Sequence, residues 1–290
     1  MNNVLVFTPT WDDDSGKLAI HPECEAMIRA NVEGFDGSAE WAIGLENPYP
    51  IGSHRNVLHQ YQRARETFLR GTYDALLTVE HDNVLPDAGA LQRMYGTQAA
   101  VVYAPYTLRH GANVLSTWQY INGRNLGMSL TNYPEELARY RRDGIGRVSG
   151  CGFGCTLIRR NVLETVGFRE DGPYQVCPDI PFAEDCLRAG FVAMGRFDVP
   201  VAHWEGNERI EAYRSIELNR YTALETANVL ADGTFIRLVE GREYALTPAQ
   251  AAELSRAGYI EAVLDSRPEY AAVEAAERAV LPKGRGRKVR

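Results

Sequence analysis

Short apolar runs alternate along the chain with segments in which apolar residues recur every three or four positions. Four of the runs have the length of buried strands: residues 3–10, 40–46, 74–79 and 99–106. Three segments between them have the spacing of helices: residues 22–34, 54–70 and 87–96. This alternation predicts an α/β fold with a Rossmann-like, mostly parallel sheet flanked by helices. In such sheets, ligands bind beyond the carboxyl ends of the strands.

The helix over 54–70 has clear boundaries in the sequence. Ser53 suits an N-cap, and Gly71 follows the last turn. Four apolar positions recur at helical spacing along this segment: Val57, Tyr61, Ala64 and Phe68. The helix is therefore expected to pack one face against the sheet.

The middle of the chain has a less regular pattern. Residues 107–147 are expected to form a loop-rich insertion that faces the binding site. Residues 147–168 indicate a glycine-rich turn, a strand and a helix, and residues 180–191 indicate a short helix led by acids. Residues 192–205 are expected to form one strand that ends at His203 and Trp204.

After about residue 210 the pattern changes again. Residues 212–230 have helical spacing, and residues 233–246 resemble a two-stranded ribbon with a turn near Gly241. Thr247 would cap a final helix. We therefore expect a main domain, a small α+β module, and a helical, basic tail that is flexible at its end: residues 1–210, 211–265 and 266–290.

Composition indicates a soluble globular protein. Of the 290 residues, 45% are hydrophobic and 24% are charged. The net charge of −7 argues against broad, sequence-blind binding to nucleic acid, although the basic tail leaves a local contact open. No signal peptide and no apolar stretch long enough to span a membrane is recognised, so a cytoplasmic location is expected.

The cysteines are odd in number and scattered, which is not the pattern of a secreted disulfide framework. They are Cys24, Cys151, Cys155, Cys177 and Cys186. Reduced thiols in a cytosolic protein are the simplest interpretation. A zinc site made by the last four is a conceivable alternative, but the paired C-x2-C spacing of such sites is missing.

Polar side chains follow directly after the apolar run of residues 74–79. Glu80, His81, Asp82 and Asn83 come next. Residues two apart on an extended segment point the same way, so both carboxylates can face one ion. Oxygen ligands at the mouth of a sheet suit Mg²⁺ or Mn²⁺. Taken alone, the pattern fits a solvated acidic loop equally well.

Two further polar positions are candidates for chemistry. Glu184 and Asp185 precede "CLRAGF", where one of them can act as a general base, although acids near a helix N-terminus also stabilise the helix by themselves. His203 ends a predicted strand, where an imidazole suits Mn²⁺ better than Mg²⁺. A lone histidine is more often structural.

Three other patterns were weighed. "SGCGFGC" lacks the third glycine of a dinucleotide fingerprint, and no P-loop is present, so this segment indicates a tight backbone that a ligand can approach. Arg55 and Asn56 open a helix whose N-terminus attracts a phosphate or a base edge, or they serve ordinary capping. The acids at 12–14 fit a solvated loop better than a second metal site.

Together, these segments resemble the nucleotide-sugar glycosyltransferases of the GT-A fold, in particular the large inverting family that includes many polysaccharide synthases. The resemblance covers about residues 3–205, and five motifs carry it in sequence order. They are "LVFTPT", "SHRNVLHQYQRARETF", "ALLTVEHDN", "SGCGFGCTLIRRNVLETVGF", and "FAEDCLRAGF" followed by "VPVAHW". The third matches the strand that ends in the D-x-D motif, with Glu80 in place of the first Asp.

The resemblance implies a role for each matching residue. Asp82, His203 and Glu80 would hold Mn²⁺ or Mg²⁺. Asp185 would be the catalytic base, with Glu184 touching the acceptor. The nucleotide-sugar would contact the first strand end, the second motif and the D-x-D segment: Thr8, Pro9, Thr10, Arg55, Asn56, Glu80 and His81. The acceptor side would be formed by the glycine-rich segment: Gly152, Phe153 and Gly154.

The implied reaction moves a sugar from a UDP- or GDP-linked donor to an acceptor hydroxyl with inversion. A glycan, a protein and a modified nucleic acid base remain open as acceptors. The general character of the sequence suggests a bacterial or phage enzyme. One alternative is a nucleotidyltransferase, although "TPTWDDDSG" lacks the early glycine-rich phosphate loop of that class. Another is a non-catalytic viral or structural module on the same fold.

Overall fold

A computed structural model gives the arrangement of the chain. It describes residues 2–11, 18–50, 53–108, 115–120, 127–170, 178–213, 219–224, 226–231, 234–241, 243–246 and 248–262. Four features of the sequence lie outside these ranges: the acids at 12–14, Cys177, Thr247 and the tail 266–290.

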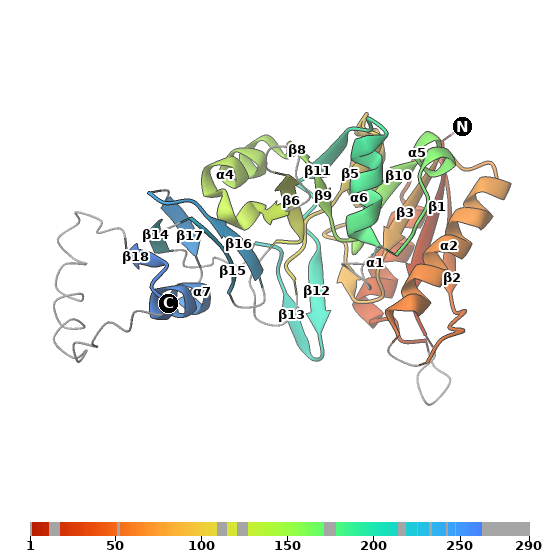
Figure 1. The fold of residues 1–290 in the computed structure, drawn as a ribbon. Helices are drawn as coiled ribbons and strands as arrows, with labels where there is room; N and C mark the ends of the chain where they lie inside the picture. Colours follow the sequence, from red (N-terminus) through yellow and green to blue (C-terminus); the bar gives the residue numbers. More distant parts are fainter. Residues whose placement is uncertain are drawn as a thin grey trace.

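A seven-stranded sheet forms the centre of the molecule (Figure 1). Its order is β2-β1-β3-β10-β5-β11-β8. Strands β1, β2, β3, β5 and β11 run in one direction, and β10 and β8 run against them. The predicted α/β fold with a mostly parallel sheet is therefore confirmed. The bounds are β1 Asn3–Pro9, β2 Ser38–Gly44, β3 Ala75–Val79, β5 Val101–Tyr103, β8 Ile145–Val148, β10 Cys155–Arg159 and β11 Ala193–Arg196.

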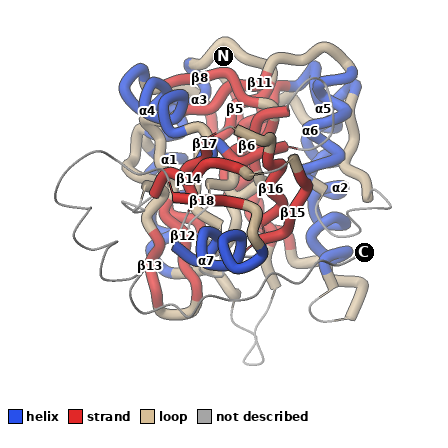
Figure 2. The backbone as a smooth tube through the Cα atoms, turned by 60° about the vertical axis from the view of Figure 1, so that its left-hand side comes forward, coloured by secondary structure: helices blue, strands red, loops and turns tan. Residues whose placement is uncertain are grey.

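Helices cover both faces of this sheet. One face carries α1 (Pro22–Glu33) and α3 (Ala90–Gly96), and the other carries α2 (His54–Arg70), α5 (Arg160–Thr165) and α6 (Asp179–Arg188), as Figures 1 and 2 show. Strand β3 is buried along its whole length because it is covered on both sides. The described helices include none that is both long and apolar enough to cross a membrane.

Helix α2 follows its sequence signals closely. It begins after Ser53, whose side chain accepts a hydrogen bond from the Arg55 backbone N–H, and it ends before Gly71. Tyr61, Ala64 and Phe68 are almost fully buried on the face that meets the sheet. The predicted range of 54–70 is confirmed.

Two small sheets lie beside the main one. β4 (Asn83–Val84), β12 (Ala202–Glu205) and β13 (Glu208–Ile210) form the first, and β6 (Thr117–Tyr120), β7 (Gly127–Ser129) and β9 (Gly150–Cys151) form the second. The single strand predicted over 192–205 is wrong. That segment forms β11 and β12 in different sheets, because a turn at 197–198, whose backbone N–H groups bond to the Gly144 carbonyl, separates them.

The region predicted to be loop-rich also holds regular structure. A 3₁₀ turn, η1 (Leu130–Asn132), leads into α4 (Pro134–Asp143). Pro134 occupies a first helical position, and Gly144 ends the helix with φ of 73°, a left-handed conformation that favours glycine. These are the usual helix boundary signals, but few apolar residues lie between them, and the expectation of a loop for this stretch is wrong.

The C-terminal part consists of strands around one helix. Its elements are β14 (Asn219–Ala223), β15 (Ala227–Ala231), β16 (Thr234–Leu238), β17 (Glu243–Leu246), α7 (Pro248–Ala257) and β18 (Ile260–Ala262). The helix predicted over 212–230 is wrong where that range is described, since β14 and β15 occupy it. The predicted ribbon over 233–246 is wrong in its pairing, because β15 pairs with β16 while β14 pairs with β17 and β18.

Burial explains why residues 227–231 form a strand where the sequence pattern predicted a helix. Val229 and Ala231 alternate along β15 and are buried, with Val229 paired to Ile236. They belong to a second hydrophobic core that also includes residues of β17, α7 and β18. Figure 2 shows β14, β17 and β18 side by side with α7 next to them. Tyr133 packs against both this core and the main one, so the two parts are in contact. The boundary near residue 210 stays a prediction.

Arg160 ties α5 to the end of α2 at the edge of the sheet remote from the carboxyl ends of β1 and β3. Its guanidinium donates to the backbone carbonyls of Tyr73 at 2.6 Å, Gly71 at 2.7 Å and Phe68 at 3.1 Å. It also lies over the Phe68 ring. Arg160 therefore has a structural role at this position.

We expect Arg160→Lys to lower the free energy of unfolding by about 1–3 kcal/mol, because an ammonium cannot reach three carbonyls in this planar arrangement. Chemical denaturation measures the effect. Arg142→Lys is the matched control, since that side chain is 73% exposed and should change stability little. Equal stability of the two variants would contradict the assigned role.

Candidate functional site

Asp82 and His203 are brought together by strand pairing. Asp82 follows β3, and the next residue, Asn83, pairs with His203 of β12. The backbone N–H of Trp204 donates to the Asp82 carbonyl at 2.9 Å, which fixes the register. The imidazole Nε2 of His203 lies 3.5 Å from the Asp82 Oδ2. Both residues are buried, with 6% of Asp82 and 3% of His203 exposed.

The partner of the other ring nitrogen fixes the orientation of His203. Its Nδ1 lies 3.1 Å from the Thr107 carbonyl oxygen. A carbonyl can only accept, so Nδ1 carries a proton and donates it. In the neutral ring, Nε2 then presents a lone pair toward a carboxylate oxygen. Two acceptors at this distance repel unless a proton or a cation lies between them.

Two neighbours complete this part of the site. The Asn83 side-chain amide donates to Asp82 Oδ1 at 3.0 Å, so Oδ2 is the oxygen that faces the imidazoles. The Nε2 of His81 lies 3.6 Å from the same Oδ2. Asn83 Oδ1 is buried and has no hydrogen-bond partner among the described residues. An additional donor or cation would find an acceptor there.

The pair Asp82 and His203 fits a divalent cation. Ligand atoms that bind Zn²⁺ or Mg²⁺ lie about 2.0–2.2 Å from the ion, so two adjacent ligands are separated by roughly 3 Å or slightly more. The separation of 3.5 Å between Oδ2 and Nε2 is close to this value. No group of three or more His, Cys, Asp or Glu side chains arranged to hold a metal occurs among the described residues. The Nε2 of His81, 3.6 Å from the same carboxylate oxygen, is the next nearest nitrogen of this kind among the described residues.

Glu80 lies near two buried tyrosines. The Tyr61 hydroxyl approaches Glu80 Oε1 at 3.4 Å. Burial raises the pKa of Tyr61 and of Tyr106 well above the usual value, and the negative charge of Glu80 raises both further. The ring of Tyr106 also meets the His203 ring edge to face, with 5.6 Å between centroids. Tyr106 therefore contacts His203 and also lies within the electrostatic reach of Glu80.

Asp179 is the second carboxylate beside Tyr106, and sequence reasoning missed it. It begins α6, and its charge raises the pKa of both Tyr61 and Tyr106. Burial raises the pKa of Asp179 itself to about 6, against hydrogen bonds from backbone N–H groups that lower it. A carboxyl group with a pKa near neutrality is suited to accept a proton from a substrate.

Asp185 has the opposite environment. Its carboxylate accepts hydrogen bonds from Arg169 at 2.6 and 3.0 Å and from Arg188 at 2.8 Å. The hydrogen bond from Arg169 is the main cause that lowers the pKa of Asp185. Asp185 also lies six residues, or about 9 Å, along α6 from Asp179. The structure therefore joins Asp82 with His203 but directs Asp185 to an ion-pair network. The adjacent Glu184 is buried and accepts from Arg188 at 3.1 Å.

The residues expected around the nucleoside are placed at the end of β1 and the start of α2. Thr8 is fully buried and its hydroxyl accepts from the Trp41 indole at 3.0 Å. Pro9 ends β1. The backbone N–H of Thr10 donates to the side-chain oxygen of Gln60, and the Thr10 carbonyl accepts from the side-chain nitrogen of Gln60. Trp11, which the sequence did not single out, exposes 46% of its surface and contacts the His81 ring.

Arg55 and Asn56 have different surroundings. Asn56 is buried, and its side chain bonds to the backbone of Tyr49 and Pro50. It therefore shapes the loop before α2. Arg55 is largely exposed and forms an ion pair with Glu170 at 3.1 Å.

The glycine-rich segment packs against Tyr106. A Cβ atom on Gly152 would lie 2.0 Å from the Tyr106 hydroxyl and 3.4 Å from Asp179 Oδ2, and one on Gly154 would lie 2.6 Å from the same ring. The space beside the glycines, where the sequence suggested that a ligand could approach, is thus filled by Tyr106. Phe153 is 3% exposed and belongs to an aromatic cluster with Tyr61 and with Phe168 and Phe182, so its ring faces the core.

The cysteines do not gather around a metal in the described part of the chain. Cys24, Cys151, Cys155 and Cys186 are buried free thiols. Cys151 contacts the Ser116 hydroxyl, and Cys155 contacts the sulfur of Met94. Burial raises the pKa of each thiol, which keeps them protonated and inert.

Comparisons with known proteins give a fold likeness at low sequence identity. No family model and no curated protein sequence matches the chain. Among solved structures, the protein A197 from STIV is 17% identical, with a TM-score of 0.44, 74% of this chain covered and 95% of that one. A mannosyltransferase from Pyrobaculum calidifontis, in complex with GDP-Man and Mn²⁺, is 15% identical, with a TM-score of 0.37 and coverage of 66% and 53%. A CMP:2-keto-3-deoxy-manno-octonic acid synthetase with CTP is 15% identical, with a TM-score of 0.35 and coverage of 67% and 89%.

Asp179→Asn is expected to stabilise the protein at neutral pH. The unfolded carboxyl ionises near 3.8 and the folded one near 6, so the wild type loses stability as pH rises between these values. A difference of about two pKa units corresponds to about 1–3 kcal/mol, which the amide recovers at pH 7.5 and not below pH 4. Asp185→Asn, on the same helix, should destabilise at pH 7.5, because the arginines lower the pKa of that carboxyl. Urea unfolding across pH compares the two, and equal pH profiles would refute the assignment.

Gly152→Ala is expected to destabilise the protein by about 1–3 kcal/mol, because the methyl group overlaps the Tyr106 hydroxyl. Adding Tyr106→Phe should recover part of that loss, since it removes the overlapping oxygen. A double-mutant cycle in thermal unfolding measures the coupling. Gly167→Ala is the control, because nothing lies within 4 Å of its added Cβ. Additive effects would show that the ring does not pack on this backbone.

Proposed function

We propose that the chain is a metal-dependent glycosyltransferase that uses a nucleoside-diphosphate sugar. The observation that carries the proposal is the buried pair of Asp82 Oδ2 and His203 Nε2, 3.5 Å apart at the carboxyl edge of the sheet. An acid and an imidazole with its lone pair toward the acid form a donor set for a divalent cation. Mn²⁺ suits a mixed oxygen and nitrogen set better than Mg²⁺ does.

The nucleotide-sugar donor would bind at the same edge of the sheet. The diphosphate oxygens would complete the coordination that Asp82 and His203 begin, and a cation bound there would neutralise charge on the departing diphosphate. The exposed ring of Trp11, beside His81, offers the nucleobase a stacking face. Thr10 and Asn47, held by Gln60, would line the ribose side.

Asp179 is the proposed catalytic base. An acceptor hydroxyl attacks the anomeric carbon, the carbon–oxygen bond to the diphosphate breaks, and the hydroxyl proton passes to Asp179. The nucleoside diphosphate leaves with the electron pair of the broken bond. A raised pKa makes Asp179 a stronger base than Asp185, whose carboxylate is held by two arginines. Asp185 and Glu184 then position α6 rather than take the proton. A base opposite the leaving group gives a single displacement with inversion.

The test is thermal unfolding with UDP- and GDP-sugars, with and without Mn²⁺. We expect at least one nucleotide sugar to raise the melting temperature only when the metal is present. Asp82→Asn should abolish this shift, since it removes a metal ligand, while Asp143→Asn, an exposed acid at the end of α4, should keep it. No shift from any donor would overturn the proposal.

Product analysis separates the alternatives. A transferase releases the nucleoside diphosphate, whereas a nucleotidyltransferase joins a nucleotide to a sugar and releases pyrophosphate. A non-catalytic module would give no product from any donor. Asp179→Asn should reduce turnover at least 100-fold while leaving the donor-induced shift in melting temperature in place.

A further inference from the structure

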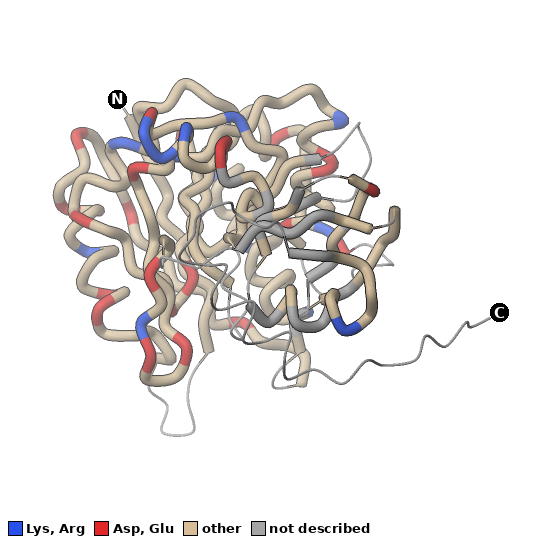
Figure 3. Tube along the Cα trace, turned by 90° about the vertical axis from the view of Figure 1, so that its left-hand side faces the viewer, with Lys and Arg blue, Asp and Glu red and all other residues tan. Residues whose placement is uncertain are grey.

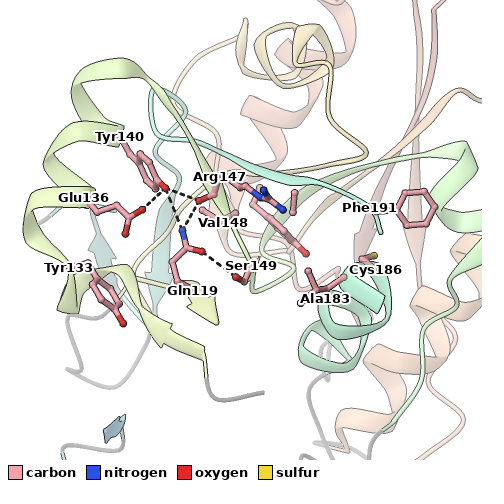
Figure 4. Close-up of a pocket in the computed structure, with 13 residues that line it drawn as sticks. Gln119, Tyr133, Glu136, Tyr140, Arg147, Val148, Ser149, Ala183, Cys186 and Phe191 are labelled. Atoms are coloured by element: carbon pink, nitrogen blue, oxygen red, sulfur yellow. Dashed lines mark hydrogen bonds between the residues drawn. The ribbon is translucent and has the colours of Figure 1, made fainter. Parts of the chain in front are cut away.

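A pocket of about 500 Å³ lies between α4, β6 and β8 on one side and α6 on the other (Figure 4). One wall is polar and carries Gln119, Glu136, Tyr140 and Ser149. The facing wall is apolar and is made by α6 and the segment after it, with Ala183, Cys186, Leu187 and Phe191. The volume is in the range of small-molecule sites.

Hydrogen bonds fix the polar wall in place. The Tyr140 hydroxyl donates to Glu136 Oε1 at 2.6 Å, and the Ser149 hydroxyl donates to Gln119 Oε1 at 3.1 Å. The amide of Gln119 donates to the Arg147 carbonyl at 2.5 Å. Figure 4 shows these side chains as one connected group. The hydrogen bonds that Glu136 makes to described residues all use Oε1, which leaves Oε2 as an acceptor at the wall.

The pocket continues from the proposed base along one helix. Ala183 lies four residues after Asp179 on α6, so it is on the same face about 6 Å further along the axis. On the opposite wall, Ser149 precedes Gly152 by three residues, and the Cβ position of Gly152 is 3.4 Å from Asp179 Oδ2. Asp179 therefore lies about one helical turn from the Ala183 that lines the pocket.

We propose that this pocket binds the acceptor and that the acceptor is an uncharged oligosaccharide; this rests on the proposed transferase function. Sugar rings have apolar faces and a rim of hydroxyls. The apolar side chains of Leu187 and Phe191 suit the faces, and the carboxylate of Glu136 and the amide of Gln119 suit the hydroxyls. The terminal ring would lie at Asp179 and the next ring inside the pocket.

The charge of the pocket argues against a nucleic-acid acceptor. Glu136 faces the cavity and would repel phosphate, and Arg147 is the only basic residue among those that line it. Figure 3 marks the acidic and the basic residues along the described part of the chain. An oligosaccharide without charge avoids this repulsion.

The test is retention of the full chain on an array of immobilised neutral oligosaccharides of two to four rings, with peptides and single-stranded DNA as further spots. Leu187→Trp should narrow the mouth of the pocket and weaken saccharide retention at least tenfold. Ala189→Trp is the matched control, because both positions are exposed on the end of α6 and only Leu187 lines the pocket. Glu136→Gln should weaken retention about fivefold, since it removes the charged acceptor but keeps an oxygen for Tyr140.

The outcomes separate this proposal from the transferase proposal. Saccharide retention that is lost in Leu187→Trp and kept in Ala189→Trp and Asp82→Asn supports the pocket. A blank array, equal retention by the two tryptophan variants, or retention on peptides or DNA alone overturns it, even where a nucleotide sugar still raises the melting temperature with Mn²⁺. Retention on saccharides without any donor-induced shift would keep the saccharide site and overturn the transferase.

Discussion

The pairing of β4 with β12 is the constraint on which the site depends. Two residue pairs join these short strands, and one of them sets Asn83 opposite His203. Asp82 and His203 are far apart in sequence, and each is nearly removed from water. A carboxylate buried beside an imidazole is costly unless a proton or cation is shared between them. The turn after β3 and the pairing of β4 with β12 hold Asp82 and His203 next to each other.

Tyr106 connects the Asp82–His203 pair with the glycine-rich segment. Its ring touches His203 on one side, and the backbone of Gly152 and Gly154 packs closely on another. The Tyr106 hydroxyl and the Asp179 Oδ2 both lie close to the Cβ position of Gly152, so these two side chains are neighbours. Desolvation favours the neutral form of a carboxyl and raises its pKa. The glycines are needed because a Cβ atom on either of them would overlap the Tyr106 ring or its hydroxyl.

Much of the fold could be predicted from the sequence, and the reasons for the failures are physical. The central strands and α2 were predictable because continuous apolar runs and a capped, periodic segment each have one low-energy solution. The stretch over 212–230 was not, because its spacing also fits a helix and burial of Val229 and Ala231 against other strands decided the outcome. Asp82 and His203 could be singled out as candidates because each follows an apolar run. Asp179 was not singled out because its one sequence signal is its position at the start of a helix after a proline, and its neighbours Tyr106 and Gly152 come from distant parts of the chain. Asp12 to Asp14 lie outside the described residues.

Two carboxylates on α6 show how environment assigns roles within one helix. Asp179 begins the helix, and burial raises its pKa to about 6. Asp185, six residues later, accepts from Arg169 and Arg188, and its pKa is lowered. Ion pairs with Arg169 and Arg188 hold one side of α6. Another side contains Asp179 and, further along the helix, Ala183 and Leu187, which line the pocket. Sequence motifs cannot distinguish the two acids, because the residue types are identical and the difference lies in what packs around them. A helix held by ion pairs on one side can therefore carry a carboxyl group with a raised pKa on another, and the helix itself fixes the spacing between Asp179 and the Ala183 that lines the pocket.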